Sequence, residues 1–239
     1  MAEIDLAVID LSQFPKEFDG AYFHHPDVVK LREACEEWGF FRVVNHGFPS
    51  DLLQKVLSVS RDLLSRPLEY KEKVPTYNTL KYNPCAEYIS FLAMPNPDMT
   101  QEITRKIWPE DGNPYFCEVI GAYGILISDL ATTITKFIIG ALGLDPRVFY
   151  QSNFGKCTAD LFISNFKFLD KCVGDEALVT HADPGVVTIV YNDDKEGLEV
   201  RSKQGQWMNV KPTPDSFIVN VGDSMKVWSN GKYRSAYHR

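Results

Sequence analysis

The sequence predicts an α+β protein in which a jelly roll or β-sandwich is buttressed by helices from the N-terminal and central parts of the chain. Three observations support this fold class. Apolar residues recur at helical spacing in several segments of the first 142 residues. The later residues form short apolar or alternating runs that are typical of strands. Turn signals such as Asn192-Asp193-Asp194 and Ser229-Asn230-Gly231 separate these runs.

The N-terminal part predicts two strands with a helix between them. Leu6 to Leu11 is mostly apolar and includes β-branched residues, so it is expected to be a buried strand. Asp27 to Trp38 has apolar residues at helical spacing, with Asp27 as the expected N-cap and Gly39 as the helix end. Phe40 to Val44 then predicts the second strand.

The central part is expected to be mainly helical. A helix should begin at Ser50, whose hydroxyl is the expected cap. Residues 67–114 are rich in Pro, Asn and Tyr, and they predict only short helices and loops. From about Tyr115 to Leu142, apolar residues recur in steps of three and four. At about 1.5 Å per residue this helix would be roughly 42 Å long, and we interpret it as a backbone helix lying across a sheet.

Short strands are expected after the long helix, each bounded by turn residues. They are Leu161–Phe168, Val186–Tyr191, Leu198–Arg201, Trp207–Lys211, Phe217–Val221 and Tyr233–His238. No internal repeat is visible in the sequence. This series of strands is the basis of the predicted jelly roll.

The composition excludes several classes of function. The 239 residues include 25 Lys and Arg against 32 Asp and Glu, which gives a net charge of −7. No Lys/Arg-rich run interrupts this acidity, so neither a nucleic-acid partner nor an anionic membrane surface is expected. A hydrophobic content of 44% is ample for a folded core.

The cysteines and the N-terminus favour a cytoplasmic protein. The five cysteines are odd in number and include no C-x-x-C pair: Cys35, Cys85, Cys117, Cys157 and Cys172. We therefore expect reduced, buried thiols, and neither a disulfide framework nor a thiolate zinc site. The N-terminus has acidic residues where a signal peptide has basic ones, and the most apolar run is too short to span a bilayer.

The sequence also contains a candidate metal site. In an extended segment His181 and Asp183 would point to the same side, because successive side chains alternate. A predicted strand far along the chain brings His238. Two imidazoles and one carboxylate are the ligand set of non-haem Fe(II) sites, and they leave positions open for substrate and O₂. Zinc more often prefers a tetrahedral set with one open position.

Spacing alone leaves a purely structural interpretation open. His25-Pro26-Asp27 has the same His-x-Asp spacing, but Pro26 fixes the backbone at a helix start and Asp27 is better explained as a helix cap. By the same logic, the second pair and His238 could serve as a strand cap, a turn residue and a surface histidine. The strands predicted around the second pair favour the metal interpretation.

The order of these motifs resembles the plant 2-oxoglutarate- and Fe(II)-dependent dioxygenases along most of the chain. Within that family the sequence is most similar to the branch that oxidises the hormone auxin. The matching residues are Val8–Leu11, Leu31–Phe41, Val44–Gly47, Thr180–Asp183, Thr188–Ile189, Gly197–Val200, Trp207, Val219–Asp223, Ser229–Ser235 and His238–Arg239.

The resemblance implies a fold and a set of residue roles. The fold would be a double-stranded β-helix in residues 155–239, after an N-terminal region of helices and strands (1–110) and the long central helix (111–150). His181, Asp183 and His238 would be the catalytic Fe(II) ligands. The co-substrates would be 2-oxoglutarate and O₂, and a small organic metabolite would be hydroxylated or similarly oxidised, with release of succinate and CO₂. His46 belongs to the family's Asn-His-Gly turn and is interpreted as structural.

Two departures from the family pattern concern the co-substrate. Family members carry an Asn-x-Tyr before the His-x-Asp, and its Tyr hydroxyl helps to hold 2-oxoglutarate, but Phe166 stands at the aligned position. The family also places an Arg-x-Ser beyond the last ligand His, and this sequence ends at Arg239. We expect the last strands to be missing and the binding of 2-oxoglutarate to be weaker by about ten- to a hundredfold or more. Arg234, Lys226 and Lys167 are candidate substitute cations, although solvated side chains are the more ordinary interpretation.

The sequence leaves more than one function open. The first is a 2-oxoglutarate-dependent dioxygenase that oxidises a small molecule such as an aromatic or hormone-like acid, with activity reduced by truncation. The second is a catalytically inactive family member that acts as a binding or regulatory protein. A third is a β-barrel enzyme that uses zinc or nickel. The sequence does not predict an oligomeric state.

Overall fold

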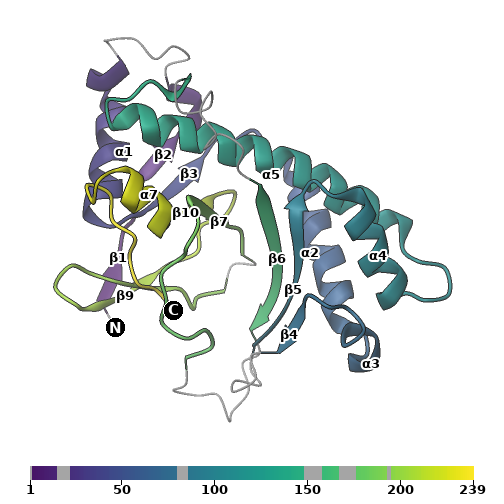
Figure 1. Ribbon diagram of the computed structural model, residues 1–239. Helices are drawn as coiled ribbons and strands as arrows, with labels where there is room; N and C mark the ends of the chain where they lie inside the picture. The colour runs from purple at the N-terminus through teal and green to yellow at the C-terminus, as the bar shows by residue number, and fades with distance from the viewer. Residues whose placement is uncertain (1, 15–21, 80–85, 148–157, 167–175, 193–194) are drawn as a thin grey trace. The chain divides into compact units, whose positions relative to one another are not determined.

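The computed structural model describes residues 2–14, 22–79, 86–147, 158–166, 176–192 and 195–239 (Figure 1). These residues belong to two compact units. Unit 1 comprises Met1–Gly47, Leu130–Lys156 and Thr180–Arg239, and unit 2 comprises Phe48–Asp129 and Cys157–Val179. Each unit therefore draws on more than one of the consecutive regions expected from the sequence.

Unit 1 contains two β-sheets. One sheet has the order β2-β3-β10-β7, in which β2 and β3 are parallel and the other neighbours are antiparallel. Its strands are β2 (Val8–Asp10), β3 (Phe40–Val44), β10 (Phe217–Val221) and β7 (Val187–Val190). The second sheet has the order β1-β9-β8. Its strands are β1 (Ala2–Ile4), β9 (Trp207–Val210) and β8 (Glu199–Arg201).

The core of unit 1 joins side chains from both sheets. Phe40 and Ile218 come from the four-stranded sheet, whereas Val200 and Val210 come from the three-stranded one, and all four are at most 3% exposed. Leu6 and Ala236 complete this buried cluster. Two sheets that share one apolar layer form a sandwich, as the jelly-roll prediction requires.

The first helix of unit 1 differs from the prediction at its start. Helix α1 (Pro26–Glu37) has His25 as its N-cap, and the Nδ1 atom of His25 accepts a hydrogen bond of 3.3 Å from the Asp27 amide. The prediction that Asp27 is the cap was wrong, because Asp27 lies inside the first turn, where its carboxylate favours the helix dipole.

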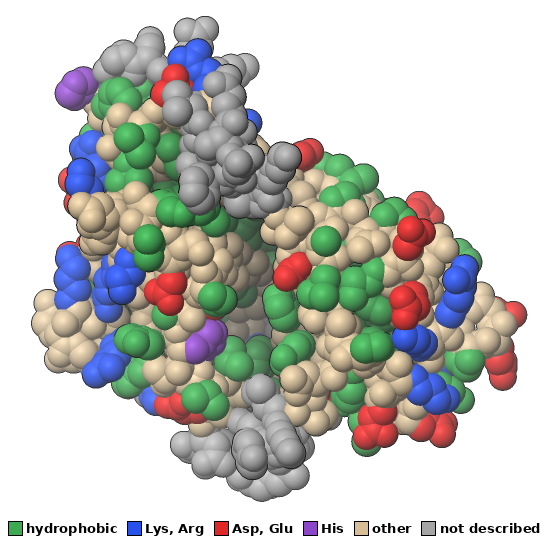
Figure 2. Space-filling view, in the orientation of Figure 1, with side chains coloured by type: hydrophobic (Ala, Val, Ile, Leu, Met, Phe, Trp, Pro, Cys, Tyr) green, Lys and Arg blue, Asp and Glu red, His purple; other side chains and the backbone are tan. Residues whose placement is uncertain are grey.

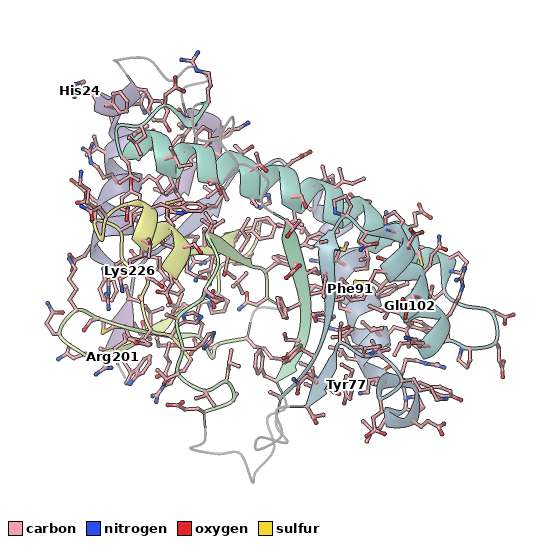
Figure 3. All side chains as sticks on the ribbon, in the orientation of Figure 1. His24, Tyr77, Phe91, Glu102, Arg201 and Lys226 are labelled. Carbon is pink, nitrogen blue, oxygen red and sulfur yellow. The ribbon has the colours of Figure 1, made fainter. Side chains whose placement is uncertain are left out.

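Further short elements of unit 1 were not predicted. They are η1 (Leu11–Gln13), η2 (Tyr22–His24) and α7 (Asp223–Trp228). Helix α7 follows β10 directly, and it carries the exposed Lys226 that is labelled in Figure 3. The strand predicted over Leu6–Leu11 is shorter at both ends, since β2 covers Val8–Asp10 and Leu11 begins η1.

Gly39 links α1 to β3 in a conformation that other residues rarely adopt. Its φ angle is +67°, and a Cβ atom at this position would lie 1.9 Å from the Arg234 carbonyl oxygen. We expect Gly39→Ala to lower the free energy of unfolding by about 2–4 kcal/mol. The loss has two causes, because Ala is strained at a positive φ and its Cβ atom would overlap the Arg234 carbonyl oxygen. Urea denaturation would measure this loss.

Gly112 provides the matched control for Gly39, because its φ is +65° and a Cβ atom at this position would have no neighbour within 4 Å. The loss of unfolding free energy in Gly112→Ala should therefore come from the positive-φ strain alone. Equal losses in the two variants would contradict a contribution from the close approach of Arg234.

Unit 2 contains a three-stranded antiparallel sheet with helices. The sheet order is β4-β5-β6, and the strands are β4 (Tyr77–Thr79), β5 (Ala86–Met94) and β6 (Ala159–Phe166). The helices are α2 (Ser50–Ser65), α3 (Leu68–Lys71) and α4 (Pro97–Ile107). Acidic and basic side chains are interspersed over α3 and α4 (Figure 2), and Glu102 is labelled on α4 in Figure 3.

Two predictions for unit 2 were wrong. Ser50 is the first residue of α2 and not its cap, because Pro49 occupies the N-cap position without a side-chain hydrogen bond. Residues 67–114 contain more than short helices and loops, because the nine-residue strand β5 lies among them. The β5 sequence escapes pattern recognition because it is buried on both faces and shows no clean alternation.

The long central helix was predicted correctly. Helix α5 (Pro114–Ala141) has 28 residues, and its buried side chains recur from Phe116 and Ile120 to Ile134 and Ile138. Among the described helices, α5 is the one whose length and composition would allow it to cross a membrane. The core helix of a soluble protein passes the same test, so this one helix is weak evidence for a membrane span.

Candidate metal centre

The segment that carries His238 extends the three-stranded sheet of unit 1. The amides and carbonyls of Arg239 and Glu199 exchange two hydrogen bonds of 3.1 Å, so the segment lies beside β8. On its other side, His238 and His181 exchange backbone hydrogen bonds of 2.9 and 3.0 Å. His238 makes isolated bridges to His181 and Val200, so the predicted regular strand Tyr233–His238 was wrong. The backbone hydrogen bonds of His238 to His181 and of Arg239 to Glu199 hold the segment instead.

Backbone contacts also fix the segment that carries Asp183. The Asp183 carbonyl accepts a hydrogen bond of 2.7 Å from the Asp223 amide at the start of α7. A Cβ atom on Gly222 would lie 2.2 Å from the Gly185 carbonyl oxygen, so the backbone after β10 approaches this turn closely. His181 and Asp183 lie outside regular strands, yet both side chains reach the same point.

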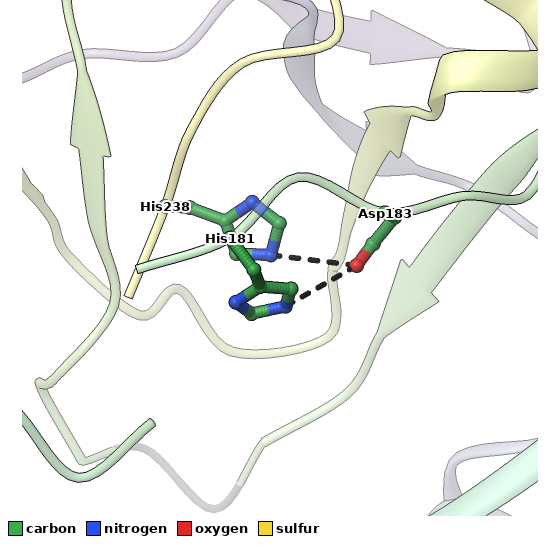
Figure 4. Close-up of side chains that lie close together, drawn as sticks. All are labelled: His181, Asp183 and His238. Atoms are coloured by element: carbon green, nitrogen blue, oxygen red, sulfur yellow. Dashed lines mark ion pairs between the residues drawn. The ribbon is translucent and has the colours of Figure 1, made fainter. Parts of the chain in front are cut away.

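Three potential metal ligands converge in unit 1 (Figure 4). One ligand atom from each of His181, Asp183 and His238 can be chosen so that all lie within 4.8 Å of one another. The Asp183 Oδ1 atom is 3.3 Å from His181 Nε2 and 3.7 Å from His238 Nε2. The two imidazole rings lie 4.3 Å apart between centroids. The structure therefore brings together the three residues that the sequence singled out.

The second oxygen of Asp183 is held by two neighbouring strands. Oδ2 accepts hydrogen bonds from the Thr188 hydroxyl on β7 and, at 2.8 Å, from the Asn220 amide on β10. Burial would raise the pKa of Asp183, but hydrogen bonds from His181, Asn220 and Thr188, with nearby His238, hold the pKa well below its ordinary value. The carboxylate is thus kept ionised with Oδ1 directed at the histidines.

The His238 ring is fixed in one tautomer. Its Nδ1 lies 3.2 Å from the Ala236 carbonyl oxygen, which can only accept, so Nδ1 carries the proton and neutral His238 presents a lone pair at Nε2. Phe40 packs edge-on against the ring with 5.3 Å between centroids. Burial lowers the pKa of His238, against the opposing effects of the Ala236 carbonyl and Asp183. The neutral ring is the form that binds metals.

These features fit a divalent metal ion held from one side. Two neutral imidazole nitrogens and one carboxylate oxygen form the facial set of non-haem iron sites. Asp183 and His238 each have hydrogen-bond partners that orient them, as is typical of metal ligands in proteins. The donor chemistry and the orientation of the donors therefore agree.

Removing the Thr188 hydroxyl should weaken metal binding. Thr188→Val keeps the shape of the side chain and removes one of the donors to Asp183 Oδ2. We expect an affinity for Co(II) about tenfold lower or more, since loss of such a partner typically costs 10- to 100-fold. Titration followed by absorbance would measure it.

Thr135 on α5 is the matched control for Thr188, because its hydroxyl donates a 2.7 Å hydrogen bond to the Ala131 carbonyl and not to a candidate metal ligand. Thr135→Val should bind Co(II) as the unchanged chain does. An affinity of Thr188→Val equal to that of Thr135→Val would argue against an orienting role for Thr188.

The remaining residues predicted from the sequence have other surroundings. Phe166 ends β6 in unit 2, where it is 44% exposed and pairs with Ala86. His46 donates from Nε2 to the Asp215 carbonyl at 3.2 Å and packs edge-on against Phe217, which agrees with the structural interpretation. His25 and Asp27 form the helix start described above.

The candidate substitute cations differ in their contacts. The guanidinium of Arg234 donates hydrogen bonds to the backbone carbonyls of Glu37 and Arg201, so it has a structural role. Lys226 is exposed on α7, and Lys167 lies outside the described residues. Of the cysteines, Cys35 and Cys117 are free thiols, and the other three lie outside the described residues. Burial raises the pKa of the Cys35 thiol, so it is inert.

Two residues that hold the candidate ligand Asp183 were not singled out from the sequence, namely Thr188 and Asn220. Asn220 carried a usable signal, because it is the single polar residue of the otherwise apolar run Phe217–Val221. In the structure it is 2% exposed. A buried amide needs a hydrogen-bond partner, and here the partner is a metal-ligand candidate. Thr188 carried no comparable signal, since Thr is common in strands.

Comparison with known proteins gives matches over both halves of the chain. Residues 158–239 match the 2OG-Fe(II) oxygenase superfamily. Residues 6–110 match the N-terminal domain described as non-haem dioxygenase in morphine synthesis. The candidate ligands all lie within the first of these matches.

Individual relatives are similar over nearly the whole chain. The protein 1-aminocyclopropane-1-carboxylate oxidase 5 of Arabidopsis thaliana is 32% identical over 88% of this chain and 71% of its own length. The dioxygenase for auxin oxidation 1 of Arabidopsis thaliana, solved with 2-oxoglutarate, has a TM-score of 0.84 and 26% identity over 98% of this chain and 86% of that one. Its rice counterpart has a TM-score of 0.82 and 26% identity over 98% and 77%.

The structural similarity confirms the predicted double-stranded β-helix. This chain spans about two thirds to three quarters of the lengths of curated plant relatives.

Proposed function

This chain belongs to the plant 2-oxoglutarate- and Fe(II)-dependent dioxygenases, and we propose that His181, Asp183 and His238 hold its iron. Its cofactor is Fe(II), and 2-oxoglutarate and O₂ are its co-substrates. The observation that carries the assignment of ligands is the approach of both Nε2 atoms to Asp183 Oδ1, within 3.3 and 3.7 Å. The substrate is a small organic metabolite, as in the family.

The surrounding residues would prepare this face before the metal binds. Thr188 and Asn220 hold one carboxylate oxygen of Asp183, so the other oxygen remains directed at the metal position. The Ala236 carbonyl fixes the His238 tautomer, and Phe40 packs against the ring at a steep angle. When bound, the iron supplies the chemistry by which 2-oxoglutarate and O₂ oxidise the substrate. Such preorganisation lowers the cost of placing the ligands.

We propose a small aromatic acid of the auxin type as the substrate class. Support comes from the two auxin-oxidising dioxygenases that resemble this structure, each at 26% identity. Because 1-aminocyclopropane-1-carboxylate oxidase 5 is also similar, a cyclic aliphatic amino acid is the natural comparison substrate.

Succinate formation tests the proposed function. Purified chain supplied with Fe(II), 2-oxoglutarate and O₂ should form succinate, and the rate should rise when indole-3-acetic acid is added and less when 1-aminocyclopropane-1-carboxylic acid is added. A folded chain that binds Fe(II) and never decarboxylates 2-oxoglutarate would instead support a binding or regulatory protein. Stimulation by the amino acid alone would contradict the aromatic substrate class.

A further inference from the structure

A group of side chains fixes the residue next to His238 on the outer face of the three-stranded sheet. Arg239 donates from Nε to Glu199 Oε2 at 2.7 Å, and its guanidinium lies 4.3 Å from the ring centre of Trp207. The side chains of Glu199 and Arg239 are 17% and 25% exposed, so the ion pair is largely shielded from water. We call Glu199, Trp207 and Arg239 the outer clamp.

The outer clamp and the metal ligands lie on opposite faces of the sheet. Neighbouring residues in extended backbone point to opposite sides, so Arg239 points away from the face on which His238 lies. His238 bridges to Val200, which is fully buried in the core, whereas Glu199 flanks Val200 and faces the other way. Glu199 and Trp207 therefore cannot touch a metal ion held by His238, and any influence on the metal must act through backbone position.

The backbone at His238 is hydrogen-bonded on both sides, but only over a few residues. It pairs through isolated bridges to His181 and Val200 and not through a continuous ladder. On the β8 side, the hydrogen bonds run to its neighbours, from the Arg201 amide to Tyr237 and between Arg239 and Glu199. A small rotation of this segment would move the Nε2 atom of His238 relative to Asp183. Side-chain contacts of Arg239 oppose such a rotation.

The Glu199 carboxylate is held by its ion pair with Arg239. Its Oε1 atom is buried and has no hydrogen-bond partner within the described parts of the chain, while Oε2 accepts from Arg239. Burying a carboxylate is costly unless a cation is paired with it. Glu199 therefore favours the one position of Arg239 that keeps the pair together, and stacking on Trp207 favours the same position.

We propose that Glu199 and Trp207 are positioning residues of the iron centre, which set the place of His238 by holding Arg239. This inference rests on the proposed function, because it assumes that His238 is a metal ligand. It assigns a role in metal binding to two residues that do not contact the metal.

Titration of the full chain with Co(II) alone, without co-substrate, tests the proposal. Glu199→Gln keeps the side-chain size and removes the charge that holds Arg239. We expect its affinity for Co(II) to fall about tenfold or more, as for loss of other supporting contacts at metal sites. The visible absorption of bound Co(II) should also change, because it reports the geometry of the ligands.

Glu3 offers the matched control in the same sheet, because it pairs with Lys211 at 2.8 Å and neither residue adjoins a ligand candidate. Glu3→Gln should bind Co(II) with unchanged affinity and spectrum. An equal loss of Co(II) affinity in Glu3→Gln and Glu199→Gln would overturn the proposal. Loss of any ion pair in this sheet would then be enough to weaken metal binding.

Trp207 gives a second, independent comparison if Glu199→Gln fails to fold. Trp207→Tyr keeps an aromatic face under the guanidinium and should retain Co(II) binding, whereas Trp207→Leu should lose affinity and change the spectrum. Equal affinities of Trp207→Leu and Trp207→Tyr would overturn the proposal. If the unchanged chain bound no Co(II), the proposed function itself would fail. Equal Co(II) affinity of the unchanged chain and Glu199→Gln would contradict only the positioning role of the outer clamp.

Discussion

Asp183→Asn should abolish Fe(II)-dependent succinate formation by this chain. Asn has one acceptor oxygen where the carboxylate has two, and Thr188 and Asn220 already donate to one side of Asp183. If the new oxygen faces these donors, the amide nitrogen faces the histidines and cannot bind metal. If the amide turns round, its N–H groups oppose the two donors. Either orientation loses the negative ligand, and we expect at least about a hundredfold lower Co(II) affinity.

The best control for Asp183→Asn lies in the same sequence. Asp27 follows His25 at the same spacing as Asp183 follows His181, but it belongs to the first turn of α1 and to no cluster of metal ligands among the described residues. Asp27→Asn should leave both succinate formation and Co(II) binding unchanged. Turnover by Asp183→Asn within about threefold of the unchanged chain would show that Asp183 is not the carboxylate ligand, whatever the outcome at Asp27.

The sequence was sufficient to single out the three candidate ligands, because their chemistry is in the residue types and their order. His181, Asp183 and His238 converge as predicted, and the rival pair at His25 starts a helix. The reason given for the convergence was partly wrong. Neither ligand segment is a regular strand, and the position of each depends on contacts with β8, β10 and α7. Such contacts between distant segments leave no local periodicity in a sequence.

The fold was predictable where the apolar residues of an element form a clear pattern or an uninterrupted run, and less so elsewhere. Helix α5 and strand β10 were located closely, since their apolar residues follow a clear pattern or run. Strand β5 was missed, because it buries Ala86, Glu87 and Ile89 together. A buried glutamate argues against a core strand until its partner is known. That partner is Lys71, which lies 16 positions earlier on α3.

Breaking this buried pair should produce the largest loss of stability outside the metal centre. In unit 2, the Lys71 Nζ atom lies 2.7 Å from Glu87 Oε2 and 2.8 Å from the Leu64 carbonyl oxygen. Lys71→Met fills a similar volume but leaves the Glu87 carboxylate buried without this ammonium. We expect the free energy of unfolding to fall by about 3–5 kcal/mol, which urea denaturation would measure.

Exposed and double variants separate the effect of charge from that of packing. Lys55 pairs with Asp51 on the surface of α2, at 2.9 Å with side chains 48% and 69% exposed, so Lys55→Met should leave the urea midpoint nearly unchanged. Glu87 also accepts from the Tyr77 hydroxyl at 2.9 Å, a hydrogen bond that Gln at position 87 could keep. Lys71→Met combined with Glu87→Gln should therefore be more stable than Lys71→Met alone, because no charge remains buried without its partner. Additive losses in the double variant would show that Lys71 stabilises unit 2 through packing and not through its charge.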